Sequence, residues 1–355
     1  MMKNEYENMK LRTLVKDLRK MQVSDNPSLL KLMLEDTAHA PDIYRPTNYW
    51  AVYEDKSLPE LQKLGLHNFR RRRNSILTSF GATDLLPSFG QIDLTNSRIA
   101  NNRITLIIPF RLKLFWLRFL WLLNYILNKI LLIGSPYDIN IEDLKQSCYE
   151  FVRMRGEKVK AKSIEDFEAS MVGNPEDIIT RGKKQYTMSI LYYYLRYVYC
   201  CNFVDFDNIK IFVELGSGCG KQIEVIKKLH PDICFLLFDI PPQLYVCEQY
   251  LSAVFPDSVV SYKDTRELDS IPELRKGKIF IFGNWKFPLL GKIKFDLFWN
   301  ARSFQEMEPE VVANYLKYVN TQANAIFLQE TMDGKEIAKV KGYHGVLQQT
   351  RLEDY

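Results

Sequence analysis

Short apolar runs alternate with amphipathic segments from about residue 209 onward. The runs predict β-strands at 209–215, 233–239, 258–262, 295–300 and 325–330, and the run at 278–283 fits either an additional strand or a shifted one. The segments between them predict helices at 219–230, 241–255 and 309–320. Because strands that alternate with helices form parallel sheets, we expect an α/β fold built on a βαβ sheet.

The first half of the chain has helical periodicity with interruptions. Residues 1–35 repeat apolar positions at helical spacing and break at 24–27, a loop rich in Pro and Tyr follows at 40–50, and helices are expected at 58–77 and 185–201. Four consecutive arginines, Arg70 to Arg73, point in different directions on a helix, so we interpret them as a solvated basic face. We expect a mainly helical, acceptor-side region at 1–200 and a sheet domain at 201–355.

Residues 104–133 are the most apolar part of the chain, and four cationic residues interrupt them: Arg111, Lys113, Arg118 and Lys129. Charge inside a bilayer is costly. We therefore favour a buried or lid helix over a membrane-interface helix, and both over a membrane span.

The composition, 46% hydrophobic and 26% charged, fits a globular chain. Residues 1–170 hold 26 Lys and Arg against 20 Asp and Glu, an excess that favours an ordinary solvated surface over an anionic partner. Nucleic acid is not among the predicted partners.

Six cysteines without a C-x-x-C pair indicate reduced thiols, and the charged first 20 residues lack the apolar core of a secretory signal. We expect a cytoplasmic protein, with peripheral membrane contact through 104–133 as the alternative.

A glycine-rich loop, Gly216-Ser217-Gly218-Cys219-Gly220, separates the first expected strand of the sheet from its helix. Glycine permits a positive φ and the close approach of a ligand. The dinucleotide pattern G-x-G-x-x-G would need glycine where the chain has Lys221. The P-loop pattern would need glycine at Leu215 and Ser or Thr at Gln222. Both phosphate-binding patterns therefore fail at named positions.

Two acidic residues accompany this loop. Glu214 precedes it, and Asp239 ends the second expected strand. A carboxylate repels pyrophosphate, but it accepts hydrogen bonds from an ammonium group or from ribose hydroxyls. S-adenosylmethionine carries a methionine ammonium and a sulfonium and has no phosphate. The loop and its two acids therefore favour S-adenosylmethionine as the cofactor.

Several segments resemble one bacterial family. "VELGSGCGKQ", "LFDIPPQLYVCEQYLSAVFP" and "FDLFWNARSFQEMEP" are similar to the sugar O-methyltransferases, class I S-adenosylmethionine-dependent enzymes with a Rossmann-like sheet, and "RPTNYW", "GLHNFRRR" and "GNPEDI" resemble the N-terminal portions of that family. The similarity runs from about residue 45 to the end. It implies that the loop residues hold the methionine part of the cofactor, Asp239 its ribose, and Asp264 the neighbourhood of its adenine; the loop residues meant are Glu214, Gly216, Ser217, Gly218 and Gly220.

Methyl transfer to a sugar hydroxyl benefits from a general base, because a hydroxyl is a weak nucleophile. The segment "NARSFQEM" follows the strand at 295–300, where open α/β sheets place their ligands. Glu306 is the candidate base, and Asn300, Ser303 and Gln305 are candidate orienting groups. Asn300 is equally a candidate contact of the cofactor. The alternative for Glu306 is a charge in the first turn of the helix at 309–320.

Histidine and metal chemistry have weaker support. His344 in "GYHG" is a minor candidate for the site. No His, Asp or Glu cluster has metal-ligand spacing, so no metal site is predicted, and the question of a divalent ion stays open with Asp296, Glu330 and Asp333 as candidate ligands.

The segment after the last expected strand, 331–355, has helical rather than paired-strand character. Class I methyltransferases normally finish with a helix and an antiparallel strand pair, so we expect those terminal strands to be missing from this chain. We predict an O-methyltransferase that acts on a sugar or glycan precursor in polysaccharide biosynthesis. The alternatives are a methyltransferase acting on an amine or another small molecule, and a truncated relative that binds S-adenosylmethionine without turnover.

Overall fold

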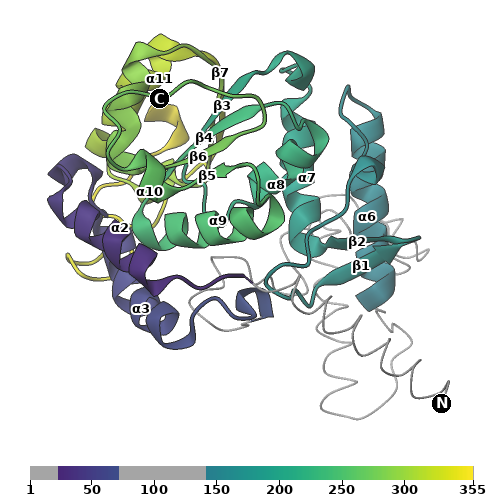
Figure 1. Ribbon diagram of the computed structural model, residues 1–355, viewed down its shortest axis with the longest axis horizontal. Helices are drawn as coiled ribbons and strands as arrows, with labels where there is room; N and C mark the ends of the chain where they lie inside the picture. The colour runs from purple at the N-terminus through teal and green to yellow at the C-terminus, as the bar shows by residue number, and fades with distance from the viewer. Residues whose placement is uncertain (1–22, 72–140, 355) are drawn as a thin grey trace. The chain divides into compact units, whose positions relative to one another are not determined.

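The computed structural model describes residues 23–71 and 141–354, which fall into two compact units (Figure 1). The first unit holds the described residues 23–71, 170–176 and 203–354, and the second holds 141–169 and 177–202. The part of the first unit that carries the sheet begins at residue 203. The helices of residues 23–71 group with the sheet, however, instead of with the rest of the first 200 residues.

The first unit is built on a six-stranded sheet in the order β5-β6-β4-β3-β7-β8, in which every neighbouring pair is parallel. Its strands are β3 (Ile211–Leu215), β4 (Cys234–Asp239), β5 (Val259–Val260), β6 (Ile279–Gly283), β7 (Phe295–Ala301) and β8 (Ala323–Gln329). The expected α/β fold with a parallel sheet is therefore confirmed. Among the described residues, no antiparallel strand joins this sheet.

The strand at 278–283 has a larger place in the sheet than the sequence analysis gave it. As β6 it pairs with β4 over five residues and is completely buried, whereas β5 contributes two residues at the sheet edge. A continuous apolar run can be buried on both faces of a parallel sheet, which explains its position beside β4. The strand that pairs with β4 on the side away from β3 is thus β6, and β5 lies beyond it.

Helices cover both faces of this sheet, while α2 (Pro27–His39) and α3 (Asn48–Leu64) pack against α9 (Pro241–Val254). The other helices of the unit are α8 (Lys221–Leu229), α10 (Tyr262–Thr265) and α11 (Pro309–Gln322). Its 3₁₀ turns are η1 (Asp42–Tyr44), η2 (Phe69–Arg71), η7 (Phe206–Asn208), η8 (Asn284–Lys292), η9 (Phe304–Glu306) and η10 (Leu352–Asp354). Alternate residues of β3, Val213 and Leu215, share a core with Phe287 of η8 and with Tyr315 of α11. Helix α9 packs against β4, β5 and β6 (Figure 1).

The N-terminal helices follow the expected pattern with two corrections. Helix α2 begins after Asn26, whose side chain caps Leu29 N, and α3 already begins at Asn48, inside the expected loop. The α-helix expected at 58–77 is wrong over 65–71, because α3 ends at Leu64 and is capped by Gly65, which has a φ of +56°. Residues 72–77 lie outside the described residues.

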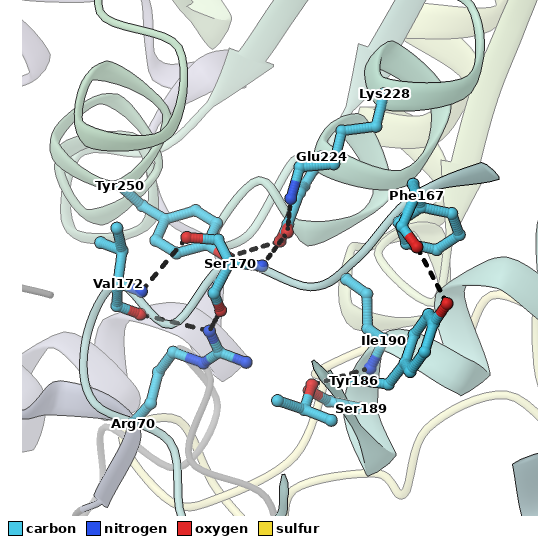
Figure 2. A network of polar contacts seen from close by, with 11 residues as sticks. Arg70, Phe167, Ser170, Val172, Tyr186, Ser189, Ile190, Glu224, Lys228 and Tyr250 are labelled. Carbon is cyan, nitrogen blue, oxygen red and sulfur yellow. Dashed lines mark hydrogen bonds and ion pairs between the residues drawn. The ribbon is translucent and has the colours of Figure 1, made fainter. Parts of the chain in front are cut away.

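The interpretation of Arg70 as part of a solvated face is also wrong. Its side chain is buried, and Nη1 donates to the carbonyl oxygens of Ser170 at 2.7 Å and Val172 at 3.2 Å (Figure 2). Glu224 lies beside it, and its carboxylate accepts hydrogen bonds from Ser170 N, Lys228 Nζ and Tyr250 Oη (Figure 2). This buried network ties η2, residues 170–176, α8 and α9 together. Arg72 and Arg73 lie outside the described residues.

The second unit consists of α6 (Ile141–Glu157), η6 (Ile164–Asp166), the antiparallel pair β1 (Ile178–Arg181) and β2 (Lys184–Thr187), and α7 (Met188–Cys200). The helix expected at 185–201 starts at Met188, because the preceding residues pair with β1. Tyr186 Oη donates to the carbonyl oxygen of Phe167 at 2.9 Å (Figure 2) and to that of Ile164 at 3.1 Å. Tyr194 and Tyr197 of α7 are buried, as expected for packing residues.

The segment after β8 is irregular up to η10, so the helical character expected for 331–355 is wrong over the described residues. It contains an isolated bridge between Ile337 and Val346. All six cysteines are free thiols and buried. Within the described ranges, no helix combines the length and the apolar character needed to cross a bilayer. The apolar segment 104–133 lies outside those ranges.

Candidate functional site

The turn between β3 and α8 has the backbone conformation that its glycines predict. Gly216, Gly218 and Gly220 have φ angles of +82°, +55° and +78°, which L-residues with a side chain rarely adopt. The backbone N–H of Gly216 donates to Phe238 O at 2.9 Å, and that of Gly220 donates to Ser217 O at 2.9 Å. The alternating glycines therefore allow the chain to turn tightly from the end of β3 into α8.

The three glycines differ in what a side chain would meet. A Cβ on Gly216 would collide with the side chain of Ser303, and a Cβ on Gly220 would come within 2.8 Å of Leu251. Around Gly218, no described atom outside its chain neighbours lies within 4 Å of the Cβ position. Gly216 and Gly220 therefore allow close packing, while Gly218 presents its backbone to open space.

Asp239 closes the turn from the neighbouring strand. Its Oδ2 accepts a hydrogen bond from Gly218 N at 2.8 Å and lies 3.5 Å from Ser217 Oγ, while Oδ1 accepts one from Ile240 N at 2.8 Å. Burial raises the pKa of Asp239 to about 7, against the lowering effect of these backbone donors, and the charge of Glu306 adds to the rise. The structure thus brings together the loop and the acid that the sequence paired.

Glu214 lies within β3, opposite Leu237 of β4 and Trp299 of β7, and its side chain is buried. Burial raises the pKa of the Cys247 thiol, and the Glu214 carboxylate contributes to that rise. Cys247 belongs to α9, so Glu214 is on the α9 side of the sheet. Alternation along the strand explains this placement, because its neighbours Val213 and Leu215 enter the core on the opposite face.

Asn300 joins the carboxyl ends of β3 and β7. It is completely buried, and its Nδ2 donates to Leu215 O at 3.0 Å and to Ser303 Oγ at 2.6 Å. Its Oδ1 accepts a hydrogen bond from Phe304 N at 3.2 Å. The chain order of the sheet reverses between β3 and β7, which is where open α/β sheets bind ligands. Asn300 therefore shapes this position from within the protein.

Glu306 stands in η9, beyond the end of β7, and its side chain is 14% exposed. The first turn of α11 contains Glu310 instead, so the alternative that Glu306 charges that helix is wrong. Burial raises the pKa of Glu306 to about 7, while Lys335, whose Nζ lies 3.2 Å from Oε1, acts in the opposite direction. Burial likewise raises the pKa of Glu330 to about 8, with a contribution from Glu306. Several carboxyl groups with raised pKa values thus lie near this end of the sheet.

Asp264 is placed differently from the other candidates. It is exposed on the short helix α10, where its Oδ2 accepts hydrogen bonds from Ser261 N and Oγ as a helix cap. The residue paired with Asp239 across the sheet is Gly283 of β6, which is followed by the buried Asn284. Asn284 Nδ2 donates to Tyr44 O at 2.7 Å and to Tyr315 Oη at 2.9 Å. The sequence analysis missed Asn284 because it treated the run at 278–283 only as an additional or shifted strand.

A group of aromatic side chains near Glu306 was also missed as part of the site. Tyr49, Trp50 and Tyr53 at the start of α3 contact one another, and His344 contacts Tyr49 and Tyr53 with ring centroids 5.2 and 5.7 Å apart. Thr47 Oγ1 donates to Glu306 O at 3.1 Å, and the side chain of Trp50 acts to lower the pKa of Glu306. The motif "RPTNYW" was the available sequence signal. No feature of the sequence indicated that this motif contacts a turn some 260 residues later in the chain.

The candidate metal ligands do not converge. Asp296 lies near the start of β7, where it accepts hydrogen bonds from Lys210 N and Ile211 N, whereas Glu330 follows the end of the parallel strand β8. The two carboxylates therefore lie at opposite ends of these two adjacent parallel strands. In the part of the chain that the structure describes, no group of three or more His, Cys, Asp or Glu side chains is arranged to hold a metal ion.

Comparison of the chain with models of known protein families, with curated proteins and with solved structures found no match.

Proposed function

We propose that the first unit binds S-adenosylmethionine at the turn between β3 and α8 and transfers its methyl group to a hydroxyl of a sugar or glycan precursor. The observation that carries this proposal is the open side of Gly218, held by Asp239 at the β3–β7 position where the strand order reverses. The similarity of "NARSFQEM" and the glycine loop to sugar O-methyltransferases points to the same chemistry.

The hydrogen bonds of the turn disfavour a phosphate ligand. The backbone N–H groups of Gly216, Gly218 and Gly220 all donate to protein oxygens, so these three donors are engaged within the fold. Phosphate sites at helix N-termini rely on backbone N–H groups that point at the ligand. Two buried acids, Glu214 and Asp239, stand beside the turn and would repel an anion. A cationic ligand without phosphate fits this environment better.

The residues present fit the parts of the cofactor. A carboxylate has about four lone-pair sites, so Asp239 can accept further hydrogen bonds from ribose hydroxyls besides those from Gly218 and Ile240. Glu214 would balance the positive charge of the methionine part, and Gly218 would permit close approach. When bound, the cofactor supplies an electrophilic methyl group on sulfur.

Glu306 is the group that would accept the proton of the acceptor hydroxyl. A general base works best when its pKa is near the working pH, and burial places that of Glu306 at about 7. The Glu306 carboxylate would take up the proton of the acceptor hydroxyl when the methyl group passes from the cofactor's sulfur to that oxygen. The aromatic rings of Tyr49 and Trp50 would exclude water and offer apolar faces to the acceptor.

An amine acceptor is the second candidate, and one contact favours it. The ammonium group of Lys335 lies 3.2 Å from Glu306 Oε1 and 4.6 Å from the centroid of the Tyr49 ring. A carboxylate and an aromatic face are the groups that bind ammonium ions in proteins. An acceptor amine could take the same place.

Calorimetric titration with S-adenosylmethionine and with S-adenosylhomocysteine tests the cofactor. Binding by the wild-type protein and weaker binding by Asp239→Ala are expected. If the wild-type protein binds neither S-adenosylmethionine nor S-adenosylhomocysteine, the proposal is overturned.

Transfer of a labelled methyl group to glycans and to an equal panel of amines then identifies the acceptor. The Glu306→Gln variant should bind the cofactor normally and lose turnover to a hydroxyl; full activity in this variant would show that Glu306 is not the base. Binding without transfer to either panel would favour a non-catalytic protein.

A further inference from the structure

The segment that follows β8 is docked on the turn that carries Glu306. Thr331 N and Oγ1 both donate to Gln305 Oε1 at 2.8 Å. On the other side of Glu306, Thr350 Oγ1 donates to Met307 O at 2.7 Å. The residues adjoining Glu306 on both sides thus hold the segment 331–350 in place.

Lys335 is held within this segment by its backbone and by the end of its side chain. Its carbonyl oxygen accepts a hydrogen bond from Gln349 Nε2 at 2.8 Å. Its Nζ lies 3.2 Å from Glu306 Oε1 and over the ring of Tyr49, and its side chain is only 22% exposed. A lysine held in this way loses less freedom when it pairs with a carboxylate than an exposed lysine does.

The charges that face Glu306 come from several elements. Lys335 in the C-terminal segment, Trp50 of α3 and Arg302 after β7 favour its ionised form. Asp239 at the end of β4, Glu330 after β8 and Tyr49 of α3 are acidic groups whose pKa values Glu306 raises, so their charges would oppose its ionisation in turn. Lys335 is the cation for which the structure gives a direct contact with the carboxylate.

We infer that Lys335 is a positioning residue that keeps the buried Glu306 carboxylate ionised and aimed, so that it can accept a proton from the acceptor. This inference rests on the proposed function for the identity of the proton donor, and on the ion pair and its docking contacts for everything else. The C-terminal segment thereby becomes part of the candidate site. A purely structural role for Lys335 would tether the segment and leave the protonation of Glu306 unchanged.

Carbon-13 NMR of carboxyl-labelled glutamate measures the protonation of Glu306 without any need for turnover, with Glu306→Gln used to assign its signal. An opposite charge at this distance lowers a carboxyl pKa by about 1–3 units. The titration midpoint of Glu306 should therefore rise by about that amount in Lys335→Met, and Lys335→Arg should restore it. Lys339→Met, which removes an exposed charge from the same segment, should leave it unchanged.

The pH dependence of methyl transfer provides the second readout. The acidic limb of kcat/KM should move to higher pH in Lys335→Met by the same shift that NMR records, and stay in place in Lys335→Arg and Lys339→Met. An unchanged Glu306 midpoint in a folded Lys335→Met or Lys335→Gln protein would overturn the inference, and so would a shifted midpoint with an unmoved kinetic limb. A shifted midpoint in a protein that transfers no methyl group would support the charge-holding role of Lys335 and overturn the proposed function.

Discussion

The carboxylate of Asp239 accepts a hydrogen bond from the backbone N–H of Gly218 at 2.8 Å, so the acid that ends β4 holds the turn that follows β3. Both residues lie at the carboxyl edge of the parallel sheet, where adjacent strand ends meet. The contact explains why the acid and the glycine depend on each other. It fixes the open face of Gly218 and leaves Asp239 with lone pairs to spare.

Adding a methyl group at Gly218 should separate strain from ligand binding. In Gly218→Ala the positive φ should cost about 1–2 kcal/mol of stability, and the new Cβ would fill the open space where we propose that the cofactor binds. Gly182, in the turn between β1 and β2, has a φ of +58° and the same open surroundings, so Gly182→Ala is a matched control. Thermal unfolding should report similar losses, while titration calorimetry should report lost S-adenosylmethionine binding for Gly218→Ala alone. Equal affinity in the two variants would contradict this assignment.

The buried carboxyl group of Asp239 should make stability depend on pH. Its pKa is raised from 3.8 to about 7, so the folded protein binds this proton more tightly than the unfolded chain does. The contribution of Asp239 to the free energy of unfolding therefore falls as the pH rises from about 4 to about 7. The Asp239→Asn variant cannot titrate there, so its stability relative to wild type should increase from pH 5 to pH 8. Denaturant titrations at both pH values measure the difference, and a constant or decreasing difference would contradict the prediction.

The buried network around Glu224 should contribute far more to stability than an exposed ion pair. Glu224 accepts hydrogen bonds from three groups in the core, and Glu224→Ala would leave Lys228 and Arg70 without that charge (Figure 2). We expect a loss of roughly 3–5 kcal/mol. Glu35 pairs with Lys31 at 3.6 Å on the surface of α2, and Glu35→Ala should cost less than about 0.5 kcal/mol. Urea unfolding of the two variants compares them directly, and similar losses would show that the network is not a stabilising tie.

Removing the side chain of Asn300 should loosen the junction between β3 and β7. Asn300→Ala would leave the buried Leu215 carbonyl and Phe304 N–H without this partner, at a cost of about 1–3 kcal/mol. Asn324 of β8 is exposed and donates to Asp296 of β7 at the other end of these strands. Asn324→Ala is therefore the control and should change little. Calorimetric unfolding measures both. Because Asn300 bonds within the fold, we also expect weaker cofactor binding in Asn300→Ala, through displacement of Ser303 from Gly216.

Several elements follow directly from the local pattern of residues. The expected strands at 209–215, 233–239 and 295–300 appear within one or two residues as β3, β4 and β7, because continuous apolar runs are buried wherever a parallel sheet forms. The glycine turn is equally local, since a positive φ at alternate positions strongly favours glycine. The adjacency of Asp239 to this turn follows from the sheet topology that the pattern implies.

Other features depend on contacts between residues far apart in the chain. Arg70 resembles its charged neighbours in sequence, and groups far from it in the chain make its burial favourable, among them the carbonyl oxygens of Ser170 and Val172 and the charge of Glu224. The strand beside β4 is β6 and not β5, because packing against the whole sheet decides which of two apolar segments lies there.

The sequence by itself determined the parallel sheet, the glycine turn and the two acids beside it, because each depends on local residue type and period. The tertiary structure alone decided that Thr47, Glu306 and Lys335 meet at one place, since three irregular segments converge there. Irregular segments have no period that predicts their path, and their positions come from side-chain hydrogen bonds such as that between Gln305 and Thr331. The charge of the candidate base is therefore a property of the fold and not of its motif.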